Sequence, residues 1–125
     1  MTKYRGTGPI FGVFKNSAFP YRFDSETVLS VYKNTREHMK KGLVIKVYDR
    51  FDGEDRQELG AVDDIALSGH GEDLKIIAVL TLNEEHEHNR IGSSVIMTDK
   101  PYILDVCFGS SALGFCKPYK FKNGN

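Results

Sequence analysis

The sequence has little cysteine, no long hydrophobic run and no excess of charge of one sign. Two cysteines with eight residues between them fit neither a disulfide framework nor a zinc pattern, so we expect a reducing, cytoplasmic setting and no metal or other cofactor. No stretch reaches the roughly 18 apolar residues of a membrane span, and the N-terminal segment MTKYRGTGPIFGVF has no apolar signal-peptide core. Because 17 Lys and Arg balance 17 Asp and Glu, nucleic acid and anionic membranes are poor candidate partners.

The sequence also lacks internal repeats, low-complexity tracts and linkers. Its 125 residues fall within the usual size of one domain, about 100–200 residues. A chain of this length buries roughly two-thirds of its unfolded surface, which is enough for a core without disulfides. We therefore predict a single domain over residues 1–125.

One segment has the pattern of an amphipathic helix that begins near residue 25. Asp24 or Ser25 can cap its N-terminus, and Gly42 stands where a glycine commonly ends a helix. The apolar face that helical spacing predicts consists of Val28, Val31, Tyr32, Thr35 and Met39.

Short apolar runs bounded by turn residues predict strands on both sides of this helix. They are Ile10–Phe14, Leu43–Tyr48, Val62–Leu67, Ser94–Met97 and Tyr102–Phe108. Leu74–Leu82 is longer, and its periodicity does not separate a strand from a buried helix. The alternation of strands and helix predicts an α/β fold with a mostly parallel sheet flanked by helices. An α+β fold with an antiparallel meander is the alternative.

Two glycine-flanked motifs follow apolar runs where strands are expected to end. Ser-Gly-His-Gly carries His70, and Asp-Val-Cys-Phe-Gly carries Cys107. Ligands bind beyond the carboxyl ends of parallel strands, and neighbouring strands about 5 Å apart would bring the two side chains together. Because an imidazole beside a thiol promotes the nucleophilic thiolate, we predict a His70–Cys107 catalytic pair.

The same two turns offer backbone donors for a developing oxyanion. The main-chain N–H groups of Gly71 and Cys107 are the candidates, since a glycine lets the backbone approach a substrate closely. The preceding Ser68-Gly69 permits the sharp turn that would lift His70 clear of the sheet.

The order of these elements resembles the large subunit of caspase-like cysteine peptidases, the family of caspases and metacaspases. DDIALSGHGED is similar to the family's histidine motif and DKPYILDVCFGSS to its cysteine motif, and the resemblance extends over residues 5–112. It implies a caspase-like large-subunit core in which His70 is the general base and Cys107 the nucleophile. It implies that the N–H groups of Gly71 and Cys107 form the oxyanion hole. It also implies that Asp105 lines the substrate pocket and favours Arg or Lys before the cleaved bond.

The chain ends soon after Cys107, and the family's small subunit has no counterpart in it. The resemblance therefore implies a peptidase that acts on a protein or peptide substrate and needs a small-subunit chain, or a second copy, as its partner. We expect an exposed apolar edge strand near Tyr102–Phe108 to make that contact. The alternative function is a non-catalytic α/β binding or inhibitory module that retains the fold.

Other residues with metal-binding or redox chemistry have simpler interpretations. His86 and His88 would share one face of an extended segment, but the surrounding glutamates favour a solvated loop over a metal site. Cys116 is expected to be structural, and a Cys107–Cys116 disulfide stays open as an alternative.

Overall fold

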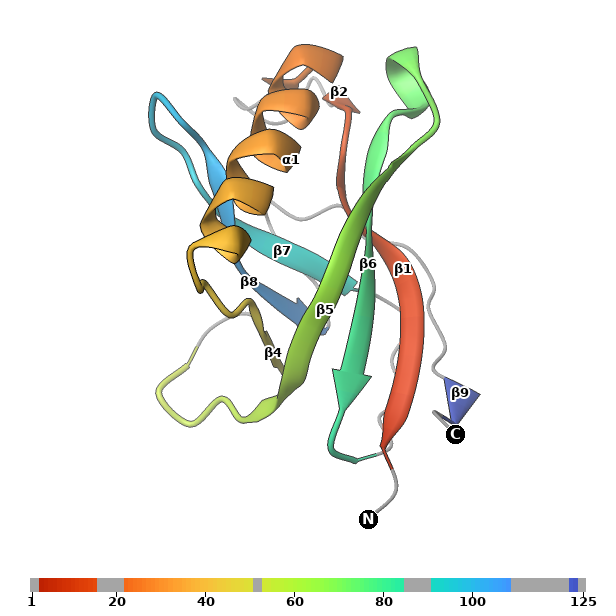
Figure 1. The fold of residues 1–125 in the computed structure, drawn as a ribbon, viewed down its shortest axis with the longest axis vertical. Coiled ribbons are helices and arrows are strands. Elements are labelled where there is room, and N and C mark those ends of the chain that lie inside the picture. Colours follow the sequence, from red (N-terminus) through yellow and green to blue (C-terminus); the bar gives the residue numbers. More distant parts are fainter. Residues whose placement is uncertain (1–2, 16–21, 51–52, 85–90, 109–121, 124–125) are drawn as a thin grey trace.

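The computed structural model describes residues 3–15, 22–50, 53–84, 91–108 and 122–123. Within these ranges one α-helix packs against a curled sheet (Figure 1). The helix is α1 (Ser25–Lys40), and the strands are β1 (Tyr4–Gly12), β2 (Phe14–Lys15), β3 (Arg22–Phe23), β4 (Lys46–Tyr48), β5 (Glu58–Ser68), β6 (Lys75–Leu82), β7 (Ile91–Ile96), β8 (Tyr102–Phe108) and β9 (Lys122–Asn123). Among the described residues, none belongs to a helix with the length and apolar character needed to cross a membrane.

The sheet is mostly antiparallel, so the prediction of a mostly parallel α/β sheet flanked by helices was wrong. Its strands run in the order β7-β8-β4-β5-β6-β1-β9, and β4–β8 is the one parallel pair among those described. The misleading feature is α1, which is not a crossover between parallel strands. β1 and β4 precede and follow it, yet they run in opposite directions with β5 and β6 between them. The antiparallel alternative fits in part, through the β5–β6 and β7–β8 hairpins.

β5 and β6 form a long hairpin within the sheet. Alternate side chains of β6, from Ile76 to Leu82, are buried, and those between them are partly exposed. This alternation is typical of a strand with one face on the core, and it shows that Leu74–Leu82 is not a buried helix. The two strands approach closely at Gly60, where a Cβ would lie 2.0 Å from the carbonyl oxygen of Thr81.

The predicted helix is confirmed. α1 follows Asp24, whose carboxylate accepts the backbone N–H of Thr27 at 2.8 Å, as an N-cap does. Beyond its C-terminus, Gly42 has a φ of +104°, which glycine adopts readily. The fully buried residues of the predicted apolar face are Val28, Val31 and Thr35.

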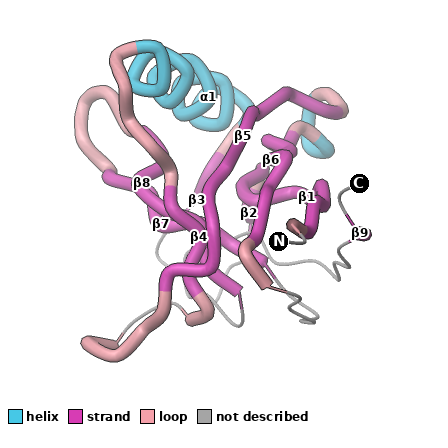
Figure 2. The backbone as a smooth tube through the Cα atoms, turned by 60° about the horizontal axis from the view of Figure 1, so that its bottom comes forward, coloured by secondary structure: helices cyan, strands magenta, loops and turns pink. Residues whose placement is uncertain are grey.

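β5 and β8 diverge because β4, which pairs with both, begins only at Lys46. α1 occupies the fork between the two diverging strands (Figures 1 and 2). Since no strand of the described part of the chain reaches into this fork, backbone groups of β5 and β8 need other hydrogen-bond partners there.

Consecutive side chains of α1 supply those partners. The Thr35 hydroxyl accepts the N–H of Ile103 in β8 at 2.9 Å, and Arg36 donates to the carbonyl of Ile65 in β5 at 3.0 Å. Asn34 donates to the carbonyl of the residue before β8 at 3.0 Å. The helix therefore replaces the missing length of β4.

The sheet curls far enough for β7 to reach β1. Ser93 in β7 is fully buried, and its hydroxyl donates to the carbonyl of Ile10 in β1 at 2.7 Å. The curled sheet and α1 enclose one core, whose largest fully buried side chains include Phe11, Phe108, Ile45, Ile76, Leu80 and Leu82.

Candidate functional site

The structure does not bring His70 and Cys107 together. Cys107 pairs with Tyr48 of β4, and Tyr48 pairs in turn with Glu58 at the start of β5. His70 follows the other end of β5, an 11-residue strand that spans about 35 Å at about 3.3 Å per residue. Because a general base must lie about 3 Å from the group it deprotonates, these side chains do not form a catalytic pair in this structure.

The Ser-Gly-His-Gly motif forms the exposed turn between β5 and β6. Gly69 and Gly71 have φ angles of +76° and +60°, and a Cβ on Gly69 would lie 2.4 Å from the carbonyl oxygen of Asp73. The glycines therefore serve the turn itself. The N–H groups of Gly71 and Cys107, predicted to share an oxyanion, are also separated by the length of β5.

Asp105 lies in a covered position beside an arginine of the same chain. It is 5% exposed, and Nη2 of Arg56 donates to its Oδ2 at 3.3 Å. The Arg56 guanidinium also lies 3.8 Å from the centre of the Tyr48 ring, while Cys107 beside Tyr48 is fully buried. The position predicted to select a basic substrate residue is therefore filled by Arg56.

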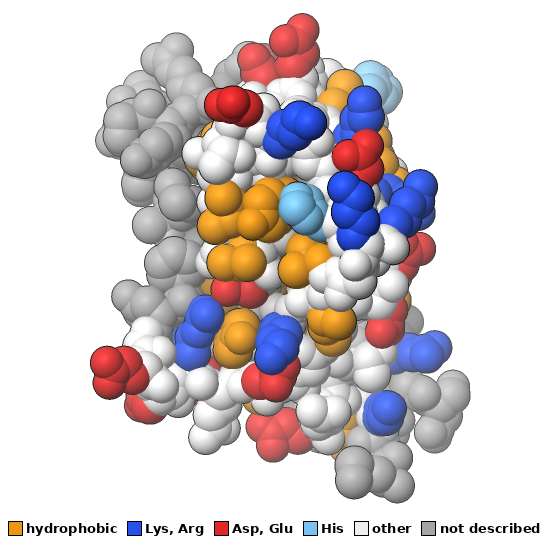
Figure 3. All heavy atoms as spheres, turned by 60° about the vertical axis from the view of Figure 1, so that its left-hand side comes forward, with side chains coloured by type: hydrophobic (Ala, Val, Ile, Leu, Met, Phe, Trp, Pro, Cys, Tyr) orange, Lys and Arg blue, Asp and Glu red, His pale blue; other side chains and the backbone are white. Residues whose placement is uncertain are grey.

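β8 is not the exposed edge strand that was expected, because it pairs with both β7 and β4. Apolar side chains do reach the surface beside it, since Val44 is 60% and Leu104 41% exposed. Figure 3 shows one face on which exposed apolar side chains lie among basic and acidic ones. Association with a partner stays a prediction.

His86 and His88, expected in a solvated loop, and Cys116, expected to be structural, lie outside the described residues. Within the described ranges, no group of three or more His, Cys, Asp or Glu side chains is placed to hold a metal ion. The interpretations of these residues therefore stay predictions.

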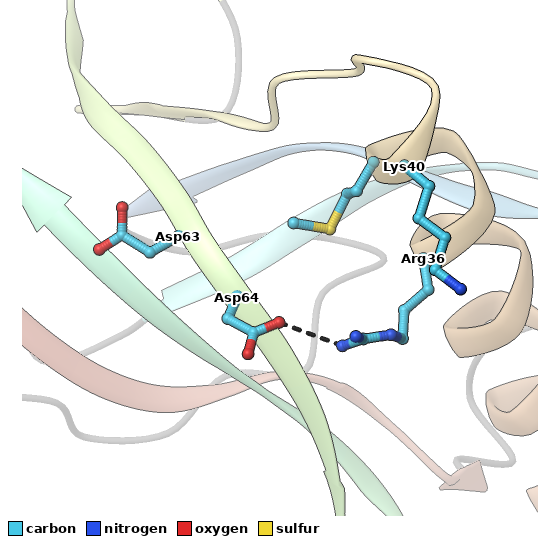
Figure 4. A pocket seen from close by; sticks show the side chains of 5 residues that line it. Arg36, Lys40, Asp63 and Asp64 are labelled. Atoms are coloured by element: carbon cyan, nitrogen blue, oxygen red, sulfur yellow. Dashed lines mark hydrogen bonds and ion pairs between the residues drawn. The ribbon is translucent and has the colours of Figure 1, made fainter.

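A β-bulge in β5 creates a site that the motifs do not include. Val62 pairs with Leu80 and Asp64 with Val79, so Asp63 is an extra residue in β5. A bulge changes the direction in which nearby side chains point. Here Asp63 and Asp64 line a hollow opposite the C-terminal turn of α1, and the carboxylate of Asp64 is the one that points to the helix (Figure 4).

A hollow of about 250 Å³ lies between the bulge and α1. Its lining residues, which we call the bulge site, are Arg36, Met39, Lys40, Asp63 and Asp64. Figure 4 shows Arg36 and Lys40 on the helix side, with Asp64 pointing to Arg36 from β5 and Asp63 pointing to the other side of that strand. Across the bulge site, Arg36 and Asp64 therefore face each other with opposite charges.

Part of this charge is paired within the site. Arg36 Nη1 lies 3.1 Å from Asp64 Oδ1, which also accepts the backbone N–H of Ile65 at 2.9 Å. Thr81 donates its hydroxyl to Asp63 Oδ2. Among the described residues, nothing hydrogen-bonds to the second oxygens of the two aspartates or to the ammonium group of Lys40.

Asp63 also lines a second hollow, of about 340 Å³, on the surface of the β5–β6 hairpin. The other residues of that hollow are Lys3, Glu58, Gly60, Ala61, Thr81 and Asn83. None of these residues has a large apolar side chain. The bulge site has Met39 in addition to its charges, and it is the better candidate.

The bulge site was not predicted from the sequence, because Asp63 and Asp64 lie inside the predicted strand Val62–Leu67. Two adjacent aspartates in an apolar run nevertheless indicate that the strand is irregular at this point. In a regular strand, one of the two would face the core, where an unpaired carboxylate is costly. A bulge removes this conflict, because it lets both carboxylates reach solvent.

No protein-family model, curated protein or solved structure matches this chain. These comparisons lend no support to the resemblance to caspase-like peptidases. The functional argument therefore depends on the geometry of the chain itself.

Proposed function

We propose that this chain is a non-catalytic binding domain whose ligand occupies the bulge site. The observation that carries the proposal is a hollow lined by both cationic and anionic residues, at an irregularity in an otherwise regular strand. Bulges are frequent next to functional sites, where they point side chains in a required direction. The volume of about 250 Å³ is smaller than that of most ligand pockets, about 300–1,000 Å³, so the expected ligand is small.

The peptidase hypothesis has less support than the binding hypothesis. A cysteine nucleophile needs a base within hydrogen-bond reach, and His70 and Cys107 lie at opposite ends of β5. Burial of Cys107 also keeps a substrate carbonyl from its sulfur. The cytoplasmic setting expected from the cysteine usage remains part of the proposal.

The proposal is tested by NMR titration of the ¹⁵N-labelled chain with a panel of small charged and zwitterionic metabolites. We expect chemical-shift changes that cluster at the backbone amides of residues 36–40 and 63–65. Lys40→Glu is expected to alter the affinity, because it reverses one charge of the hollow. Lys33→Glu is the matched control, since it reverses a charge on the same helix outside the hollow.

Two results would contradict a binding domain of this kind. The first is a set of shift changes that avoids the bulge site, or no shift at all at millimolar ligand. The second is peptide hydrolysis by the purified chain that Cys107→Ala abolishes, which would favour the peptidase hypothesis instead.

A further inference from the structure

We draw no further inference here: the strongest candidate, the apolar surface that Val44 and Leu104 expose beside β8, carries nothing because the described part of the structure does not show what covers it.

Discussion

Thr35 is a polar residue in the core, and its hydroxyl has a defined partner. The side chain is fully buried and accepts the N–H of Ile103 at 2.9 Å. Valine has nearly the same shape as threonine but has no oxygen, so it leaves this buried N–H without an acceptor. An unsatisfied buried group of this kind costs about 1–3 kcal/mol.

We predict that Thr35→Val lowers the free energy of unfolding by about 1–3 kcal/mol, measured by urea denaturation. Thr35→Ser keeps the hydroxyl and is expected to cost less, through the loss of one methyl group. A Thr35→Val variant as stable as the parent chain would show that this hydrogen bond makes no net contribution to the free energy of unfolding.

Asp49 links stability to pH. Its carboxylate accepts the backbone N–H of Gln57 at 2.8 Å, and Arg50 lies 3.4 Å away. The bond from Gln57 is the main reason that the pKa of Asp49 lies below its usual value of 3.8, and Arg50 adds to the effect. Because the pKa is lowered only in the folded state, the unfolded chain binds more protons near this pH. The stabilisation is therefore complete well above pH 3.8 and is lost as the pH falls through the lowered pKa.

We predict that Asp49→Asn reduces the loss of stability on acidification below about pH 4. The measurement is urea denaturation of both chains at a series of pH values from about 5 to 2. Asp99→Asn, at an exposed position in the turn between β7 and β8, is the control for removing one carboxylate. Parallel stability curves for the parent and Asp49→Asn would contradict this role.

The β5–β6 hairpin depends on a glycine at its open end, where Gly60 pairs with Leu82, the last residue of β6. At Gly60, a Cβ would lie 2.0 Å from the carbonyl oxygen of Thr81, which belongs to the neighbouring backbone and cannot rotate away. Gly60→Ala therefore forces the two strands apart, and we predict a loss of about 1–3 kcal/mol in the free energy of unfolding. Ala61→Ser adds one atom at the partly exposed neighbouring position and is expected to cost less. Equal unfolding midpoints for the two variants would contradict the predicted steric clash at residue 60.

The sequence predicts local elements better than their arrangement. α1 is predictable because its capping residue, its apolar spacing and Gly42 are all local signals. The turn at residues 68–71 is also predictable, from its two glycines. The local sequence of a strand, however, does not determine which strand it pairs with. Pairing depends on contacts between distant residues, such as β4 with β8. The predicted His70–Cys107 pair depends on a parallel arrangement that these contacts do not provide.

The separation of His70 from Cys107 can be tested on the intact molecule. We predict that iodoacetamide alkylates Cys107 in the folded chain much more slowly than in the urea-unfolded chain, because the residue is fully buried. His70→Ala is expected to leave that rate unchanged. Peptide mass spectrometry distinguishes Cys107 from Cys116 in the same experiment. A rate that falls severalfold in His70→Ala would restore the catalytic pair.

The helix in the fork between β5 and β8 also determines which parts of the chain fold together. The β5–β6 and β7–β8 hairpins are each local. They are joined through a β4 of only three residues, through side chains of α1, and through the contact of β7 with β1, which pairs with β6. If α1 detaches, the amide of Ile103 and the carbonyl of Ile65 lose their partners at the same moment. The helix and the two hairpins are thereby coupled into one cooperative folding unit, although they lie far apart along the chain.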